Sequence, residues 1–78
     1  MTYQQLLEKT KDIDLEKLRV FLGMRSNLID SMSLYRDGDE WVELHIDDMQ
    51  HTFEFRGTEE DVCESTYMYI RMKLELGY

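Results

Sequence analysis

The sequence contains no proline and a single cysteine, Cys63. One thiol cannot form an internal disulfide, and the four isolated glycines do not make a phosphate-binding loop. No apolar run approaches the roughly 20 residues that cross a bilayer, and the N-terminus lacks the basic and apolar regions of a signal peptide. We therefore expect a cytoplasmic protein. Because low-complexity tracts are also absent and 42% of the residues are hydrophobic, the chain is expected to fold.

Basic residues are scarce, and the net charge is −8. The segment from Asp37 to Glu64 holds eleven acidic residues and one basic residue, Arg56, whereas the other residues hold six acidic and eight basic ones. Such a segment disfavours contact with nucleic acid or an anionic membrane and favours a basic protein partner. The alternative is that the acidic residues only keep the protein soluble.

The length of 78 residues corresponds to one domain, residues 1–78. A chain of this size buries only about 60% of its unfolded surface, so its stability margin is small. We therefore expect neither a second domain nor a deep substrate cleft.

Three stretches have the pattern of β-strands: 32–36, 40–46 and 51–55. The Asp37-Gly38 pair between the first two is typical of a tight hairpin turn, and residues 47–50 form a second polar break. The strands are therefore expected to form a three-stranded antiparallel meander.

Two helices are expected to flank this sheet. Thr2 and Gln5 have the spacing of a capping box, and the apolar spacing that follows indicates either one helix up to Gly23 or two short helices broken near 12–14. Thr58, followed by three acidic residues, predicts the start of a long helix over 59–76 that ends at Gly77. The predicted fold class is α+β, with both helices packed on one face of the meander.

Alternation in the second strand places Val42, Leu44 and Ile46 on one face and Trp41, Glu43 and His45 on the other. We expect the apolar set to face the helices and the opposite face, with Tyr35, to be exposed to solvent. Aromatic side chains surrounded by acidic ones are typical of protein-binding surfaces. Trp41 is either a partner contact or is covered by the loop over 25–30. The predicted partner-binding residues are Tyr35, Asp39, Trp41, Glu43, His45, Asp47 and Asp48.

The sequence shows no catalytic or metal-binding signature. His45, Asp47, Asp48 and His51 lie close in sequence, but they lack the ligand spacing of a zinc site or a calcium loop. Cys63 is flanked by acidic residues, which raise rather than lower the pKa of a thiol. The expectation is a protein that is not an enzyme and that needs no metal or cofactor.

The run from Leu34 to Leu44 contains a tryptophan-bearing strand, and it is followed by Phe53–Gly57 and by a helix opening with Thr58, two glutamates and an aspartate before Val62-Cys63-Glu64. This layout resembles that of small bacterial immunity proteins of polymorphic or contact-dependent toxin systems. The likeness covers residues 34–70. It implies a mode of action, neutralisation of a toxin, without identifying the toxin.

The leading hypothesis is therefore an acidic inhibitor that neutralises a basic toxin, such as a nuclease, by covering its active face. One alternative is a phage-encoded inhibitor of restriction or CRISPR systems whose acidic face imitates nucleic acid. Another is a structural protein that forms a homodimer through the surplus apolar surface of the C-terminal helix.

Overall fold

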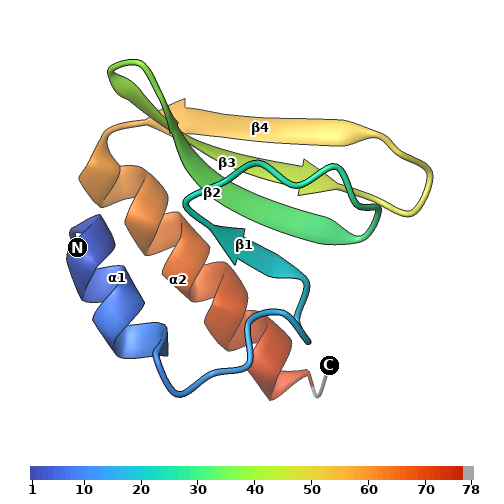
Figure 1. Cartoon of the computed structure of the whole chain (residues 1–78), viewed down its shortest axis with the longest axis horizontal. Helices are drawn as coiled ribbons and strands as arrows, with labels where there is room; N and C mark the ends of the chain where they lie inside the picture. The colour runs from blue at the N-terminus through green and yellow to red at the C-terminus, as the bar shows by residue number, and fades with distance from the viewer. Residues whose placement is uncertain (77–78) are drawn as a thin grey trace.

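A computed structural model describes residues 1–76 and shows an α+β fold in which two helices pack on a four-stranded sheet (Figure 1). The sheet has the order β1-β2-β3-β4, with β1 parallel to β2 and the other pairs antiparallel. The elements are α1 (Tyr3–Thr10), β1 (Val20–Leu22), β2 (Ser31–Asp37), β3 (Glu40–Ile46), β4 (Thr52–Gly57) and α2 (Glu59–Glu75). The α+β class is confirmed, whereas the three-stranded antiparallel sheet was wrong in detail because β1 adds a parallel strand.

Both predicted helix starts are confirmed. The Thr2 hydroxyl accepts a hydrogen bond from the Gln5 amide at 3.1 Å, and the Gln5 side chain accepts one from the Thr2 amide at 2.8 Å. The Thr58 hydroxyl accepts a hydrogen bond from the Asp61 amide at 3.2 Å at the start of α2. The expected end of this helix at Gly77 lies outside the described residues.

The segment between α1 and β1 is not helical, although both versions of the prediction made it so. Arg19 has a φ of 58°, in the left-handed region that an α-helix does not use. The next residue, Val20, starts β1 and lies opposite Met32 of β2. Pairing with the sheet therefore prevails over the helical spacing of the leucines, and Gly23 follows a strand rather than a helix.

The hairpin between β2 and β3 forms where it was predicted. Asp37 lies opposite Glu40, which leaves Gly38 and Asp39 as the turn, and Gly38 has a φ of 63°. No atom lies within 4 Å of the Cβ position that a side chain would add at Gly38. Glycine is therefore favoured here by its backbone conformation and not by lack of space.

Strand register defines two faces of the sheet, which we call the helix face and the loop face. The helix face carries Met32, Leu34, Arg36, Trp41, Glu43, His45, Phe53 and Phe55. The loop face carries Ser31, Ser33, Tyr35, Val42, Leu44, Ile46, Thr52, Glu54 and Arg56. The expected orientation was therefore wrong: the helices pack on the face that bears Trp41, Glu43 and His45, and Tyr35 lies on the opposite face from Trp41.

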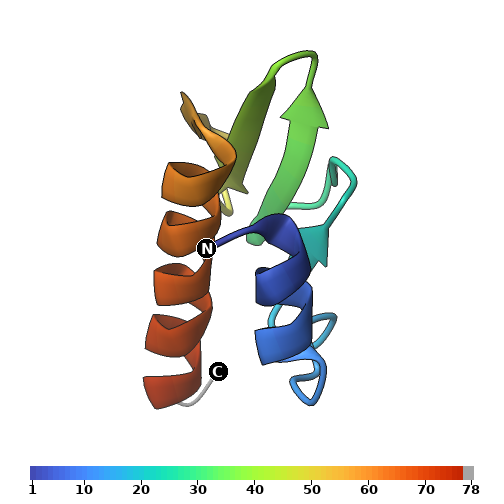
Figure 2. The same cartoon turned by 90° about the vertical axis from the view of Figure 1, so that its left-hand side faces the viewer.

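The helices cover the β1 to β3 part of the helix face. Figure 2 shows α1 and α2 side by side on the same side of the sheet. The buried side chains of this layer come from both helices, from the segment before β1 and from two strands; they are Leu6, Leu18, Val20, Met32, Leu34, Val62, Cys63 and Ile70. The buried residues of α2 are Val62, Cys63, Thr66 and Ile70, whose spacing places them on one face of the helix.

The loop face is covered by residues 23–30, which cross in front of the sheet in Figure 1. The Ser26 amide donates a hydrogen bond of 2.8 Å to the hydroxyl of Ser33 and thereby attaches this loop to β2. Val42, Leu44 and Ile46 are buried on this face, with Tyr35 packed against them. Leu28 and Ile29 of this loop are exposed.

Candidate functional site

The acidic segment forms one end of the sheet, one turn and the start of α2. Asp37 to Glu40 form the hairpin tip, Asp47 and Asp48 lie between β3 and β4, and Glu59 to Asp61 form the first turn of α2. β4 lies between the last two groups in sequence, so acidic residues flank this strand at both of its ends.

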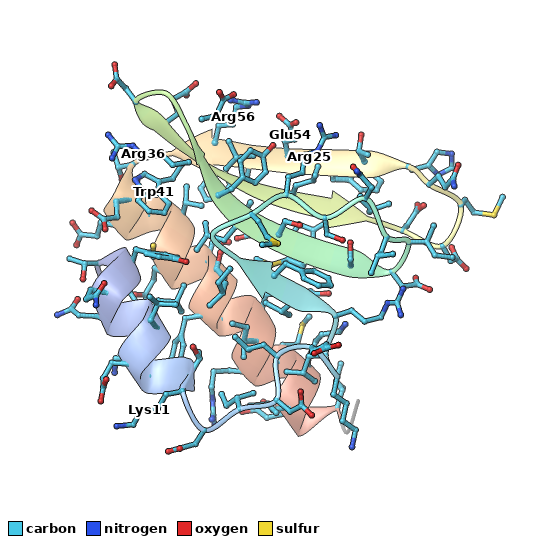
Figure 3. All side chains as sticks on the ribbon, in the orientation of Figure 1. Lys11, Arg25, Arg36, Trp41, Glu54 and Arg56 are labelled. Atoms are coloured by element: carbon cyan, nitrogen blue, oxygen red, sulfur yellow. The ribbon has the colours of Figure 1, made fainter. Side chains whose placement is uncertain are left out.

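Arg56 is the only basic residue of this segment, and three carboxylates surround it. Its guanidinium lies 2.8 Å from Glu54, 3.0 Å from Asp37 and 3.6 Å from Glu40. The hydrogen bonds to Glu54 and Asp37 raise the pKa of Arg56 above its ordinary value. One cation against three anions leaves this cluster with a net negative charge. Figure 3 shows Arg56 and Glu54 on β4, with Arg25 of the covering loop close to Glu54 in the same view.

Asp47, a predicted partner contact, organises the turn before β4. Its carboxylate accepts hydrogen bonds from the amides of Met49 at 2.9 Å and His51 at 2.8 Å, and its second oxygen lies 3.1 Å from the His51 ring. Desolvation opposes ionisation, but the hydrogen bonds from His51 and Met49 outweigh it and lower the pKa of Asp47. Asp39 and Asp48, by contrast, are exposed at turn tips and make no ion pair within residues 1–76.

The three predicted aromatic anchors are half-buried and do not share a surface. Trp41 packs against Tyr3 of α1, with ring centroids 5.2 Å apart, and Figure 3 places it at the hairpin end of the sheet beside the helices. His45 meets the ring of Tyr69 edge-on at 4.8 Å. Tyr35 packs on the loop face. The chain's own helices therefore cover the faces of Trp41 and His45 that were expected to meet a partner.

Glu43 is buried beneath α2, with 5% of its surface exposed. One carboxylate oxygen accepts a hydrogen bond of 3.2 Å from the Thr66 hydroxyl, and the other is bonded to the ring of His45. A buried carboxylate requires such partners because burial without them is costly. Glu43 therefore serves the interior of the fold, and its charge is not presented to a partner.

Two phenylalanines of β4 are exposed, although they were not among the predicted surface residues. Phe53 and Phe55 lie opposite His45 and Glu43 on the helix face, yet 59% and 43% of their surfaces are exposed. The helices cover only the β1 to β3 part of that face, so these rings lie beside α2 rather than under it. The two rings occupy alternate positions of one strand, and acidic residues lie on either side of them in the sequence.

A cavity of about 570 Å³ opens at the end of β3, next to Phe53. It is lined by Lys17, Leu18, Arg19, Asp30, Ser31, His45, Ile46, Asp47, Phe53, Tyr69 and Lys73. The Lys73 ammonium donates a hydrogen bond of 2.9 Å to the carbonyl of Leu18, and desolvation lowers the pKa of this lysine. An imidazole held by a carboxylate is an arrangement that general acid–base chemistry uses, and His45 reaches this cavity. The cavity mixes cationic and anionic groups, so its lining does not select one ligand charge.

Cys63 lies on the buried face of α2, in the core. Burial, with a smaller effect of the nearby Glu59 carboxylate, raises the pKa of its thiol to about 11. The thiol is therefore neutral at physiological pH, which disfavours reaction as a nucleophile.

Within residues 1–76, no three histidine, cysteine or acidic side chains lie close enough together to hold a metal ion. In the same part of the chain, neither helix has the length and apolar character to cross a membrane.

Comparisons with protein families, with curated proteins and with solved structures each found no match. The resemblance to immunity proteins therefore stays a prediction.

Proposed function

We propose that this protein is a non-enzymatic inhibitor that binds a basic protein, such as a nuclease toxin, and covers its functional face, as an immunity protein does. The observation that carries this proposal is the exposed β4, on which two uncovered phenylalanines lie between groups of acidic residues. Aromatic side chains supply much of the energy of protein interfaces, and complementary charge speeds their formation.

Four of the eleven acidic residues in the acidic segment are available to a partner. Asp39, Asp48, Glu60 and Asp61 are exposed, and their carboxylates make no ion pair among the described residues. Nuclease active sites are positively charged because they bind phosphate, so an acidic surface competes for them. In this proposal Phe53 and Phe55 take the anchoring role that the sequence had suggested for Tyr35, Trp41 and His45.

The test starts from the protein that the tagged chain captures from its source cell. Its activity is measured with increasing amounts of the chain, and the expected result is loss of activity at a ratio of one to one. Capture alone does not support the proposal. A captured protein that keeps full activity when saturated with the chain would overturn it.

Two matched variants test the role of charge. The first neutralises the acidic surface with Asp39→Asn, Asp48→Asn, Glu60→Gln and Asp61→Asn. The control neutralises four exposed acidic residues at the other side of the molecule with Glu8→Gln, Asp12→Asn, Asp14→Asn and Glu16→Gln. We expect the first variant to slow association with the target by about tenfold or more at low salt, and the control to change it by less than about twofold. Equal slowing of association by both variants would show that the rate depends on the net charge of the protein and not on the position of its acidic residues.

Two other functions predict different results in the same assays. A nucleic-acid mimic would inhibit a DNA-binding protein and would be displaced from it by duplex DNA. A structural homodimer is favoured by the exposed Met68 and Met72 on α2. It would show twice the chain mass in light scattering at micromolar concentration, and Met68→Lys would return it to a monomer.

A further inference from the structure

The backbone of β4 has one unused edge. This strand pairs with β3 and with no other strand in residues 1–76. It is six residues long, and five of these residues are exposed. Unpaired edges of this length readily accept another strand.

Hydrogen bonds elsewhere in the sheet show which groups of β4 point outward. The Met32 amide donates to the carbonyl of Arg19, and the Leu34 carbonyl accepts from the amide of Gly23, so these two β2 residues direct their backbone groups toward β1. Because the direction alternates along a strand, Ser33 and Tyr35 must face β3.

The same alternation continues across β3 to β4. Leu44 and Val42 pair with Ser33 and Tyr35, so Glu43 and His45 direct their backbone groups toward β4. The Asp47 amide donates to the carbonyl of His51 at 3.0 Å, which agrees with this assignment.

Phe53, Phe55 and Gly57 are therefore hydrogen-bonded to β3. The outward N–H and C=O groups of the edge belong to Thr52, Glu54 and Arg56. No backbone hydrogen bond from these outward groups is found among the described residues.

The side chains beside this edge differ on its two faces. On the helix face, an added strand would meet the exposed rings of Phe53 and Phe55. On the loop face it would meet Glu54 and the cluster in which Asp37 and Glu40 share the Arg56 guanidinium. The edge thus offers an apolar contact on one side and a negative charge on the other.

A second copy of the chain fits this edge poorly. Pairing two β4 strands would place two acidic clusters together, and each chain carries a net charge of −8. Like charges on neighbouring strands are destabilising, whereas opposite charges stabilise the pair. The charge therefore selects a basic strand.

We propose that β4 accepts an extended basic segment of the target as a fifth strand, with lysine or arginine on the loop face alternating with apolar side chains on the helix face. This inference rests on the proposed function, because it assumes that the target binds at the exposed β4 and adds that it binds there by backbone strand pairing. The backbone supplies hydrogen bonds from Thr52, Glu54 and Arg56, and the side chains select the alternating pattern.

The probe is an acetylated peptide in which lysine and valine alternate over nine positions. Amide hydrogen exchange of the ¹⁵N-labelled protein is measured with and without this peptide. We expect exchange of the Thr52, Glu54 and Arg56 amides to slow by about tenfold or more, while the amides of Phe53 and Phe55 are slow throughout. A control peptide with the same side chains but N-methylated at every residue has no N–H to donate from either edge, so it cannot pair as a strand and is expected to give no protection.

Two variants at one position separate the backbone from the charge. Glu54→Pro removes an outward N–H without removing a bond to β3, a change that edge strands tolerate. Glu54→Gln keeps the N–H and removes the charge. We expect Glu54→Pro to weaken peptide binding at least about fivefold beyond Glu54→Gln, because it also removes a hydrogen bond. Circular dichroism checks the fold, and if Glu54→Pro does not fold, Thr52→Pro at the first residue of the strand replaces it.

Several results would overturn the inference. The first is that the peptide does not bind, and the second is that it binds without protecting the three outward amides. The third is protection of these amides in the free protein that increases with protein concentration, which would assign the edge to a second copy.

The proposed function fails separately. If Glu54→Pro still inhibits the target while the acid-neutralised variant does not, the function stands and the edge is not used. If the peptide protects the edge but no basic protein is inhibited, the edge stands and the function does not.

Discussion

The helix face and the loop face of the sheet each bury a leucine almost completely, but their covers differ. Leu34 lies under two helices whose side chains interlock with it, and Leu44 lies under an irregular loop attached by the Ser26 to Ser33 hydrogen bond. The comparison shows how a chain of 78 residues can bury both faces of one sheet without a second layer of helices. It also predicts that truncating a buried side chain lowers the free energy of unfolding by different amounts in the two cores.

The largest expected difference comes from a matched pair of truncations. Leu34→Ala should lower the free energy of unfolding by about 3 to 5 kcal/mol, because packed helices cannot move into the space. Leu44→Ala should cost about 2 to 3 kcal/mol, because the loop can settle into part of the cavity. Urea denaturation followed by circular dichroism measures both. Equal losses would show that the loop is as rigid a cover as the helices, and Leu34→Val with Leu44→Val carries the comparison if either alanine variant is unfolded.

A smaller effect is expected from releasing the loop. Ser33→Ala removes the acceptor of the Ser26 amide and leaves that buried donor without its partner, which should cost about 1 to 2 kcal/mol. Hydrogen exchange should become faster at Ser26 and Leu28 while the amides of α2 are unchanged. If exchange increases equally in α2, the two faces are not independent and the loop is part of one cooperative core.

The smallest effect concerns the turn between β3 and β4, which belongs to neither core. Asp47 has a folded pKa below its ordinary value of 3.8, so its stabilising contribution is present above that value and is lost as the pH falls through the lower, folded value. Asp47→Asn keeps an oxygen that accepts from the two amides but removes the charge. The variant should be slightly less stable than the natural chain near neutral pH, and the two should converge in acid. A difference that persists at pH 2 would mean that the charge is not its cause.

Sequence reasoning located most of the elements because their signals are local. The caps at Thr2 and Thr58 and the turn at Gly38 depend on residues within four positions of one another, and all three are present. β1 depends instead on pairing with β2, twelve positions away, and this pairing overrides the helical spacing of the leucines that precede it.

The orientation of the sheet could not be obtained from alternation. A period of two separates the side chains of β3 into two sets, but it does not say which set meets the helices when both sides are covered. Trp41, Glu43 and His45 have the composition of a surface. They are accommodated under the helices because Thr66 and Tyr69 of α2 and Tyr3 of α1 supply partners for them. Those partners lie 23 or more residues away, so no local pattern indicates them.

The acidic segment can be read directly from the sequence, but which aromatic residues beside it are exposed cannot. Phe53 and Phe55 would ordinarily be assigned to a core, and only the limited width of the two helices leaves them uncovered. The exposure of an edge strand depends on how far the covering layer extends, which is a property of the assembled fold.

The position of Cys63 gives the protein a built-in reporter of its own stability. It is the only thiol in the chain and is fully buried among the residues that α2 brings to the sheet. A thiol reagent can reach it only when α2 separates from the strands. When the reagent is dilute enough that reclosing is faster than labelling, the labelling rate is proportional to the equilibrium population of the open molecule. Every variant discussed above retains this cysteine, and their stabilities can be compared under native conditions without denaturant or an added probe.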